Sequence, residues 1–204
     1  LNATLPGELA AACRRRGVRM VHISTDAVFD GTKSSPYIET DAPNPVSVYA
    51  RTKLAGENAV LEADPEAIVA RVNFYGWSMG GMRSLAEFFV KNLSAGKRVH
   101  GFTDVTFCPT FVGDLADLLP AMLAKPLHGL YHTVGGECMS KYAFGVAIAR
   151  RFGLDDTLIS PQSVDHSGLV ARRAHNLCLS THRLSTDLGA PVPAFSTGLD
   201  RFYA

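Results

Sequence analysis

The sequence has almost no excess charge and no long apolar run, and each absence excludes a class of function. Twenty Lys and Arg residues stand against 19 Asp and Glu residues, so the formal net charge at pH 7 is +1. Nucleic acids and anionic membrane surfaces select a strong basic excess, which this chain does not have. No apolar run approaches the roughly 20 residues of a membrane-spanning helix. We therefore expect a chain that binds neither nucleic acid nor membrane.

Cysteine is also scarce. The four cysteines, Cys13, Cys108, Cys138 and Cys178, form no C-x-x-C pair and lie far apart in the sequence. Such spacing is not typical of a zinc site or of a disulfide framework, so we expect buried, reduced thiols and no metal. The sequence does not open with a basic region followed by an apolar stretch, so no signal peptide is visible. These features predict a cytoplasmic protein.

What is present is the composition of a folded chain. Hydrophobic residues make up 47% of the 204 residues and charged residues 19%. Disordered chains are less apolar and more strongly charged. The length allows one domain, or a domain and a half, with a full core.

The first third of the sequence alternates helix and strand. The patterns predict a helix that begins at Thr4 as its N-cap, a strand over 18–23, a helix over 48–63 and a strand over 67–72. The loop between the first strand and the second helix is long, and ordered loops of that length are often functional. This alternation predicts a parallel α/β sheet with right-handed crossovers.

The remaining two thirds are more mixed. Helices are predicted over 82–93, 112–123, 140–152 and 181–188, and strands over 97–99 and 129–134. The tail from Pro161 onward is otherwise predicted to be loop.

The residues that carry chemistry gather around the first strand and the second helix. Ser-Thr-Asp at 24–26 follows the strand, at the edge where open α/β sheets bind ligands. Tyr49 and Lys53 lie four apart on the helix and therefore share a face. A free tyrosine titrates near pH 10, and a neighbouring ammonium lowers the pKa of the phenol. With the Thr25 hydroxyl to hold a carbonyl, these residues form a proton-transfer site, which a nicotinamide cofactor would complete with a hydride.

Each of these motifs has a structural alternative. Tyr-x-x-x-Lys alone is common on helices, and Ser-Thr-Asp after a strand can be turn chemistry. The order of the features, with the strand first, then Ser-Thr-Asp, the long loop and Tyr-x-x-x-Lys on a helix, favours the catalytic interpretation.

Five segments carry a family resemblance: STDAVFDG at 24–31, PYIETDAPNPVSVYARTKLAGE at 36–57, RVNFYG at 71–76, FCPTFVGDLADLL at 107–119 and GLYHTVGGECMSKYAFG at 129–145. With them the chain resembles the extended short-chain dehydrogenase/reductases, most closely the dTDP-4-dehydrorhamnose reductase-like branch. The resemblance implies the C-terminal portion of a Rossmann-type parallel sheet with a smaller, interleaved α+β region that binds substrate. It implies a division into 1–76, the second half of a dinucleotide-binding domain, and 77–204, mainly substrate-binding, with 129–152 returning to the sheet.

The same resemblance implies the reaction. Thr25, Tyr49 and Lys53 match the family's catalytic set, in which the tyrosine protonates the C4 keto oxygen of a nucleotide-linked deoxysugar. NADPH or NADH is the implied cofactor, and a homodimer is a possible assembly. The residues implied for the cofactor are Ser24, Tyr49, Lys53, Asn73 and Phe74, and those implied for the substrate are Thr25, Asp26 and Asn73.

Two other functions of related proteins stay open. An NAD-dependent nucleotide-sugar epimerase would use the same residues and retain its cofactor tightly. A non-catalytic regulatory subunit, like that of methionine adenosyltransferase, would bind a partner protein. A dehydratase is disfavoured, because Ala27 follows Asp26 where the family's dehydratases carry a glutamate. Ala27 also departs from the aromatic residue usual in the reductases, which bears on the choice of sugar.

Three further pairs of residues are candidates for a role in binding. His128 and His132 lie four apart, but a predicted strand between them separates them by about 13 Å, so a metal role is not expected. Arg172 and Arg173 could meet a diphosphate, although a surface turn is favoured. Tyr75 and Trp77 suit either the sugar site or the core.

The sequence also lacks the G-x-x-G-x-x-G turn with which this family holds the pyrophosphate of its cofactor. We therefore expect these 204 residues alone to bind NADPH weakly. A fluorescence titration of the chain with NADPH measures this directly. Tight binding would contradict the expectation.

Overall fold

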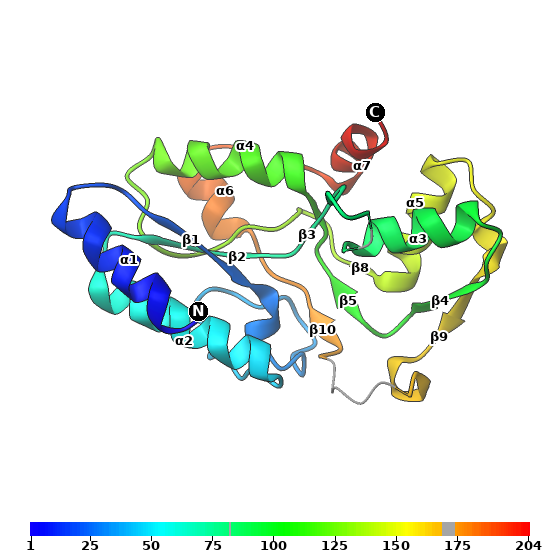
Figure 1. Cartoon of the computed structure of the whole chain (residues 1–204), viewed down its shortest axis with the longest axis horizontal. Coiled ribbons are helices and arrows are strands. Elements are labelled where there is room, and N and C mark those ends of the chain that lie inside the picture. The colour runs from blue at the N-terminus through cyan, green and yellow to red at the C-terminus, as the bar shows by residue number, and fades with distance from the viewer. Residues whose placement is uncertain (82, 169–173) are drawn as a thin grey trace.

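The computed structural model describes residues 1–81, 83–168 and 174–204, and it has the predicted α/β class. A parallel sheet of order β1-β2-β7 forms its larger part, from β1 (Val21–Thr25), β2 (Ile68–Val72) and β7 (Gly129–His132). Figure 1 shows α1 (Thr4–Arg15) and α2 (Val48–Ala63) on one face of this sheet, and α4 (Val112–Leu123) and α6 (His182–Leu188) on the other. The sheet is thus covered on both faces, as buried parallel sheets require.

Strand β2 lies at the centre of the sheet and is buried along its whole length. Four of its five residues are apolar, which is typical of a parallel strand covered on both faces. The exception is Arg71, whose guanidinium is paired with the buried carboxylate of Glu57 on α2. Helix α1 packs closely on α2 at Gly7, where an added Cβ would lie only 2.9 Å from the Cβ of Ala59 on α2.

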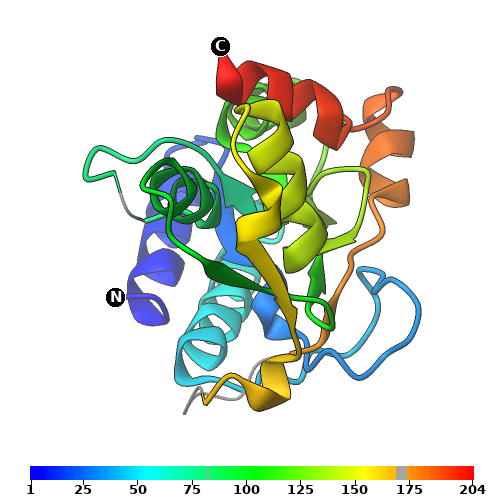
Figure 2. The same cartoon turned by 90° about the vertical axis from the view of Figure 1, so that its right-hand side faces the viewer.

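The second part of the molecule surrounds an aromatic core, and Figure 2 looks onto this side. Helices α3 (Leu85–Ser94) and α5 (Lys141–Arg151) pack against each other and against β4 (Val99–Phe102), which pairs with β9 (Ile159–Gln162). The short strands are β3 (Phe74–Tyr75) with β6 (Thr110–Phe111), and β10 (Asn176–Leu177) with β5 (Thr106–Phe107) and β8 (Met139–Ser140). Within 129–152, then, β7 joins the large sheet, whereas α5 packs in this second part.

Several predicted boundaries differ from the structure. Thr4 lies inside α1, whose N-cap is Ala3, and β1 begins at Val21 rather than at residue 18. Helix α3 begins at Leu85, because Ser84 and Glu87 form a capping box there. Strand β4 covers Val99–Phe102 rather than 97–99. Among the described helices, none is long and apolar enough to cross a membrane.

The prediction of a loop-rich tail missed helix α7 (Phe195–Tyr203). Its Phe195, Leu199 and Phe202 recur at helical spacing and are buried in the aromatic core. Proline and glycine residues just before it mask that pattern in the sequence.

The prediction of reduced thiols was wrong for two of the four cysteines and holds for Cys13 and Cys178, which are free. Cys108 and Cys138 form a disulfide, with their Cα atoms 4.3 Å apart. The antiparallel pairing of β5 with β8 sets Phe107 opposite Met139. Cys108 follows Phe107 and Cys138 precedes Met139, so the two cysteines also lie opposite each other. Sequence spacing does not report this register, because the paired segments are only two residues long.

His132 lies buried in β7, while His128 is exposed, so the two do not form a metal pair. His132 Nδ1 lies 3.2 Å from the carbonyl oxygen of Ser180. Burial, reinforced by the charge of Arg71, lowers the pKa of His132 to about 3. The folded protein therefore holds this imidazole neutral.

This burial predicts acid sensitivity. Because the unfolded chain binds the His132 proton near pH 6.5 and the folded chain only near pH 3, stability is lost as the pH falls between these values. Between pH 7 and pH 5 the loss from this group is about 2 kcal/mol. His132→Asn should remove that part of the pH dependence, measured by urea unfolding at both pH values. His128→Asn is the control and should keep it; equal slopes in all three proteins would contradict the prediction.

Candidate functional site

The predicted site residues line one cavity at the carboxyl ends of β1 and β2. The cavity has a volume of about 360 Å³. Its lining residues are Ile23, Ser24, Thr25, Asp26, Tyr49, Lys53, Val72, Asn73 and Phe74. The structure thus brings together every residue that the sequence nominates for catalysis, cofactor and substrate.

The two strand ends place their polar residues side by side. Thr25 and Val72 are register partners in the parallel pair, so the next residues, Asp26 and Asn73, are neighbours. The Asn73 amide donates a hydrogen bond to Asp26 Oδ2 at 2.5 Å. Thr25 accepts from the backbone N–H of Ala27 at 3.2 Å and donates to Asp26 Oδ1 at 3.1 Å, which caps the short 3-10 helix Asp26–Val28. The polar edge of the cavity is therefore an ordered network.

Helix α2 supplies the phenol and the ammonium. Ser47 caps its first turn by accepting from the N–H of Ala50, which sets the helix to begin just before Tyr49. Tyr49 is about half exposed, so its hydroxyl is accessible from the cavity. Lys53 Nζ donates to the carbonyl oxygen of Ile23 at 2.5 Å, which anchors the ammonium to β1. Burial lowers the pKa of Lys53, and the charge of Glu57 opposes that effect.

Glu57, one helical turn beyond Lys53, is fully buried and joins three elements. Its carboxylate accepts from Arg71 Nη2 at 2.7 Å and from Arg71 Nε at 3.0 Å, and it also accepts from the Ser24 hydroxyl. This network ties α2 to β2 and to β1. Sequence reasoning missed Glu57 and Arg71, although an arginine within an otherwise apolar strand is a signal for a buried ion pair.

Asp26 is a second buried carboxyl group. Burial raises its pKa to about 6, and the hydrogen bonds from Asn73 and Thr25 oppose that rise. At neutral pH the group is mostly ionised and accepts from both neighbours. A carboxyl group poised near pH 6 at the wall of a cavity is typical of a functional site.

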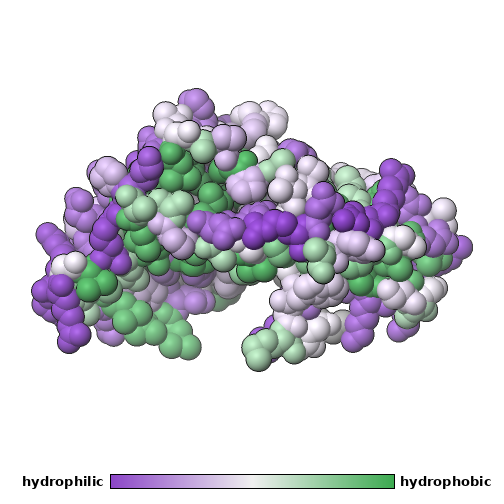
Figure 3. All heavy atoms as spheres, turned by 90° about the horizontal axis from the view of Figure 1, so that it is seen from above, coloured by the Kyte–Doolittle hydropathy of each residue, from purple (hydrophilic) through white to green (hydrophobic). Residues whose placement is uncertain are grey.

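A second cavity, of about 520 Å³, shares Asn73 and Phe74 with the first. Its wall includes two cationic residues, Arg83 and Lys141, that the sequence did not single out. Trp77 also lines it, half exposed, with its indole stacked on Phe202 and its N–H donated to the Phe202 carbonyl. Figure 3 shows the surface hollowed between the part that holds the β1-β2-β7 sheet and the part that holds α3 and α5. Arg172 and Arg173 lie outside the described residues.

The whole chain, residues 1–204, matches the family model described as the RmlD substrate binding domain. The chain belongs to this family. Among curated relatives, the dTDP-4-dehydrorhamnose reductase of Mycobacterium tuberculosis is 36% identical over 222 residues, which cover 98% of this chain and 72% of that protein. The methionine adenosyltransferase 2 subunit beta of Mus musculus is 34% identical over 210 residues, which cover 98% of this chain and 61% of that protein.

Solved structures agree with the RmlD assignment. A dTDP-4-dehydrorhamnose reductase from Clostridium acetobutylicum superposes with a TM-score of 0.91 at 28% identity, covering 99% of this chain and 71% of that one. The same reductase from Bacillus anthracis, solved in complex with NADP, has a TM-score of 0.91 at 25% identity and covers 100% and 71%. The predictions of family and of fold class are confirmed.

The Asp26–Asn73 contact gives a test of this site. Asn73→Ala removes the foremost hydrogen bond that stabilises the Asp26 carboxylate, so the pKa of Asp26 should rise above about 6. A pH titration of the side-chain carboxyl carbons by NMR measures it.

Asn44→Ala is the matched control, because Asn44 donates to Asp30 on the exposed loop and does not touch Asp26. An unchanged or lower pKa of Asp26 in Asn73→Ala would contradict this reading of the site. The raised pKa of Asp26 affects stability with the opposite sign to the lowered pKa of His132. The Asp26 contribution to stability is fully present at acid pH and is lost as the pH rises from about 4 through 6.

Proposed function

We propose that this chain carries the catalytic residues of an NAD(P)H-dependent reductase that acts on the 4-keto group of a nucleotide-linked deoxysugar. The observation that carries the proposal is the single cavity that holds Thr25, Tyr49 and Lys53 at the ends of parallel strands. The relatives named as dTDP-4-dehydrorhamnose reductases support the same reaction class and the same kind of substrate.

The residues that line the cavity suit the nicotinamide end of the cofactor. Lys53 and Tyr49 offer polar groups for a ribose, while Val72 and Phe74 offer an apolar wall for a flat ring. These residues fit, and when bound the cofactor would supply the hydride. The NADP complex of the Bacillus anthracis reductase supports this choice. We propose accordingly that 1–76 serves the cofactor and 77–204 mainly the sugar nucleotide.

In the proposed mechanism Thr25 donates its hydroxyl proton in a hydrogen bond to the substrate carbonyl, turning from its present acceptor Asp26. That bond holds the carbonyl oxygen toward Tyr49, whose phenol donates the proton that the reduced oxygen needs. The ammonium of Lys53, held on β1 by the Ile23 carbonyl, favours the phenolate that this transfer leaves. Asn73 keeps Asp26 in place beside Thr25.

The second cavity suits the rest of the substrate. Arg83 and Lys141 at its wall match the two negative charges of a sugar-nucleotide diphosphate, and Trp77 offers an aromatic surface. Because the two cavities meet at Asn73 and Phe74, one molecule could place its keto group at Tyr49 and its diphosphate at Arg83.

A non-catalytic regulatory subunit is the second candidate, because a relative named as a methionine adenosyltransferase subunit aligns with 98% of this chain. The presence of all three catalytic side chains in one cavity favours the enzyme. An epimerase would use the same residues but retain its cofactor, so the absorbance spectrum of the intact protein distinguishes it from a reductase.

The central test is Tyr49→Phe in the intact protein that carries this chain, assayed with NADPH and dTDP-4-dehydrorhamnose. Loss of the proton donor should lower kcat by about 10²–10⁴-fold while the substrate still binds. Tyr203→Phe is the matched control, because Tyr203 lies exposed on α7 outside both cavities, and it should keep the wild-type rate. A Tyr49→Phe protein that keeps the wild-type rate would refute the proposed function.

A further inference from the structure

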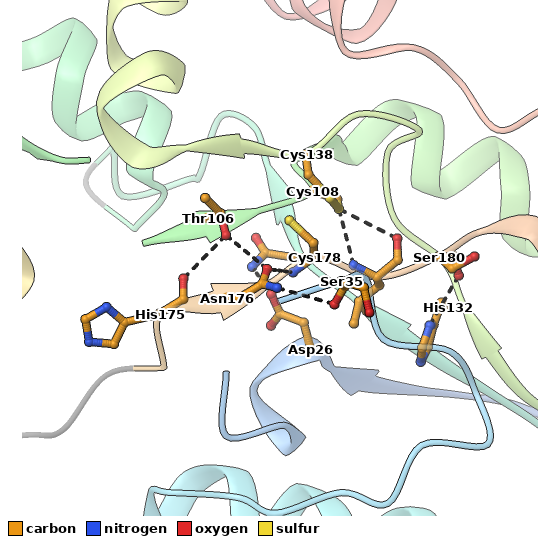
Figure 4. The surroundings of a disulfide bond; sticks show 12 residues. Asp26, Ser35, Thr106, Cys108, His132, Cys138, His175, Asn176, Cys178 and Ser180 are labelled. Carbon is orange, nitrogen blue, oxygen red and sulfur yellow. Dashed lines mark hydrogen bonds between the residues drawn. A yellow bond between two sulfur atoms is a disulfide. The ribbon is translucent and has the colours of Figure 1, made fainter. Parts of the chain in front are cut away.

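Three of the four cysteines meet at one end of the small sheet β10-β5-β8. Leu177 pairs with Phe107, and Phe107 pairs with Met139. The residues next to these partners are Cys178, Cys108 and Cys138, so the register aligns three cysteines across three strands. Their sulfur atoms all lie within 4.8 Å of one another, and Figure 4 shows Cys178 beside the Cys108–Cys138 disulfide.

The three sulfur atoms have different surroundings. Cys108 is buried, and the backbone N–H of Leu179 donates to its sulfur at 3.4 Å. Cys138 is exposed, and Cys178 is a half-buried free thiol. Because Cys138 is exposed and Cys108 is buried, a thiolate from solvent reaches Cys138, and Cys108 is then the leaving group of the disulfide. The hydrogen bond from Leu179 stabilises the departing Cys108 thiolate, and the burial of Cys108 opposes that charge.

We propose that Cys108, Cys138 and Cys178 form a redox-active three-thiol site that exchanges with small thiols and disulfides of the glutathione class. In reduction, a glutathione thiolate attacks the Cys138 sulfur, the Cys108–Cys138 bond breaks, and Cys108 leaves as a thiolate that takes up a proton. A second glutathione then attacks the mixed disulfide and releases Cys138 as a thiol. The net reaction converts one protein disulfide and two glutathione thiols into two protein thiols and one glutathione disulfide.

Cys178 allows a disulfide exchange within the chain itself, without glutathione. Its thiolate attacks Cys138, a Cys138–Cys178 bond forms, and Cys108 leaves and takes up the proton that Cys178 lost, with no net oxidation. Burial raises the pKa of the Cys178 thiol, so this exchange should quicken as the pH rises above neutrality.

The three cysteines are connected by packing to residues that follow Thr25 and Asp26 in the chain. Cys108 belongs to the same buried cluster as Val28 and Phe29, and Cys178 packs against it. Val28 and Phe29 follow the Thr25–Asp26 turn almost directly in the chain. Because the disulfide closes a segment with a sequence separation of 30 residues, its reduction should lower Tm by about 7–15 °C.

The first experiment follows the oxidation state of the whole chain. The chain is equilibrated in glutathione buffers of increasing disulfide content, its native thiols are alkylated, and its peptides are mapped by mass spectrometry without reduction. At the oxidising end we expect alkylated Cys13 and Cys178 and a linked Cys108–Cys138 peptide pair. The transition should be reversible and should move Tm as stated. Four alkylated cysteines across the whole range would overturn the proposal.

The second experiment tests whether Cys178 can form a disulfide with each of the other two cysteines. Under glutathione disulfide, Cys138→Ser should form a Cys108–Cys178 bond, and Cys108→Ser should form a Cys138–Cys178 bond. Cys13→Ser, on the distant helix α1, is the control and should keep the wild-type pairing and Tm. If Cys108→Ser does not fold, judged by circular dichroism, Cys138→Ser decides, because Cys138 is exposed.

Two further outcomes would overturn the exchange site. One is the absence of any new disulfide in a folded variant. The other is a reduced chain that binds one cadmium ion through thiolates and then resists oxidation by glutathione disulfide, which would assign the cluster to a soft metal.

Discussion

The site depends on one buried ion pair, between Glu57 on α2 and Arg71 on β2. Both side chains are removed from water, which is costly unless each charge has close partners. Arg71 has two of its nitrogens on the carboxylate, and its guanidinium carbon lies 4.9 Å from the centre of the Phe29 ring. The hydroxyl of Ser24, on β1, donates a further hydrogen bond to the Glu57 carboxylate. The pair therefore joins the helix that carries Tyr49 to the strands that end in the polar edge of the cavity.

The Glu57–Arg71 pair sets the positions of the side chains that line the cavity. Glu57 lies one helical turn from Lys53, and Lys53 lies one turn from Tyr49, so fixing Glu57 sets the rotation of α2 about its axis. Ser24 and Arg71 are register partners one step before Thr25 and Val72. The same pair therefore aligns the strand ends from which Thr25 and the Asp26–Asn73 contact follow. Arg71 is also the register partner of His132, whose imidazole it helps to keep neutral.

Sequence reasoning found the cavity because its signals are local. Strand ends and a four-residue spacing on a helix place Thr25, Tyr49 and Lys53 without any knowledge of the fold. The Cys108–Cys138 pairing and the Glu57–Arg71 ion pair escaped because each joins two separate elements, and local sequence patterns do not report how those elements pack. Helix α7 had the right spacing of Phe195, Leu199 and Phe202, but its short length and the prolines before it concealed it. The cations of the second cavity, Arg83 and Lys141, come from elements that only the folded chain brings together.

A double-mutant cycle on Glu57→Gln and Arg71→Met, followed by urea unfolding, tests this account most directly. Each single change leaves its partner unpaired in the interior and should cost about 3–5 kcal/mol. The double variant should cost far less than the two losses added together, because it leaves no buried charge. The exposed pair Arg150–Asp156 is the control, with coupling below about 1 kcal/mol. Losses at Glu57 and Arg71 that simply add would contradict the account, since the two groups would then not act as a pair.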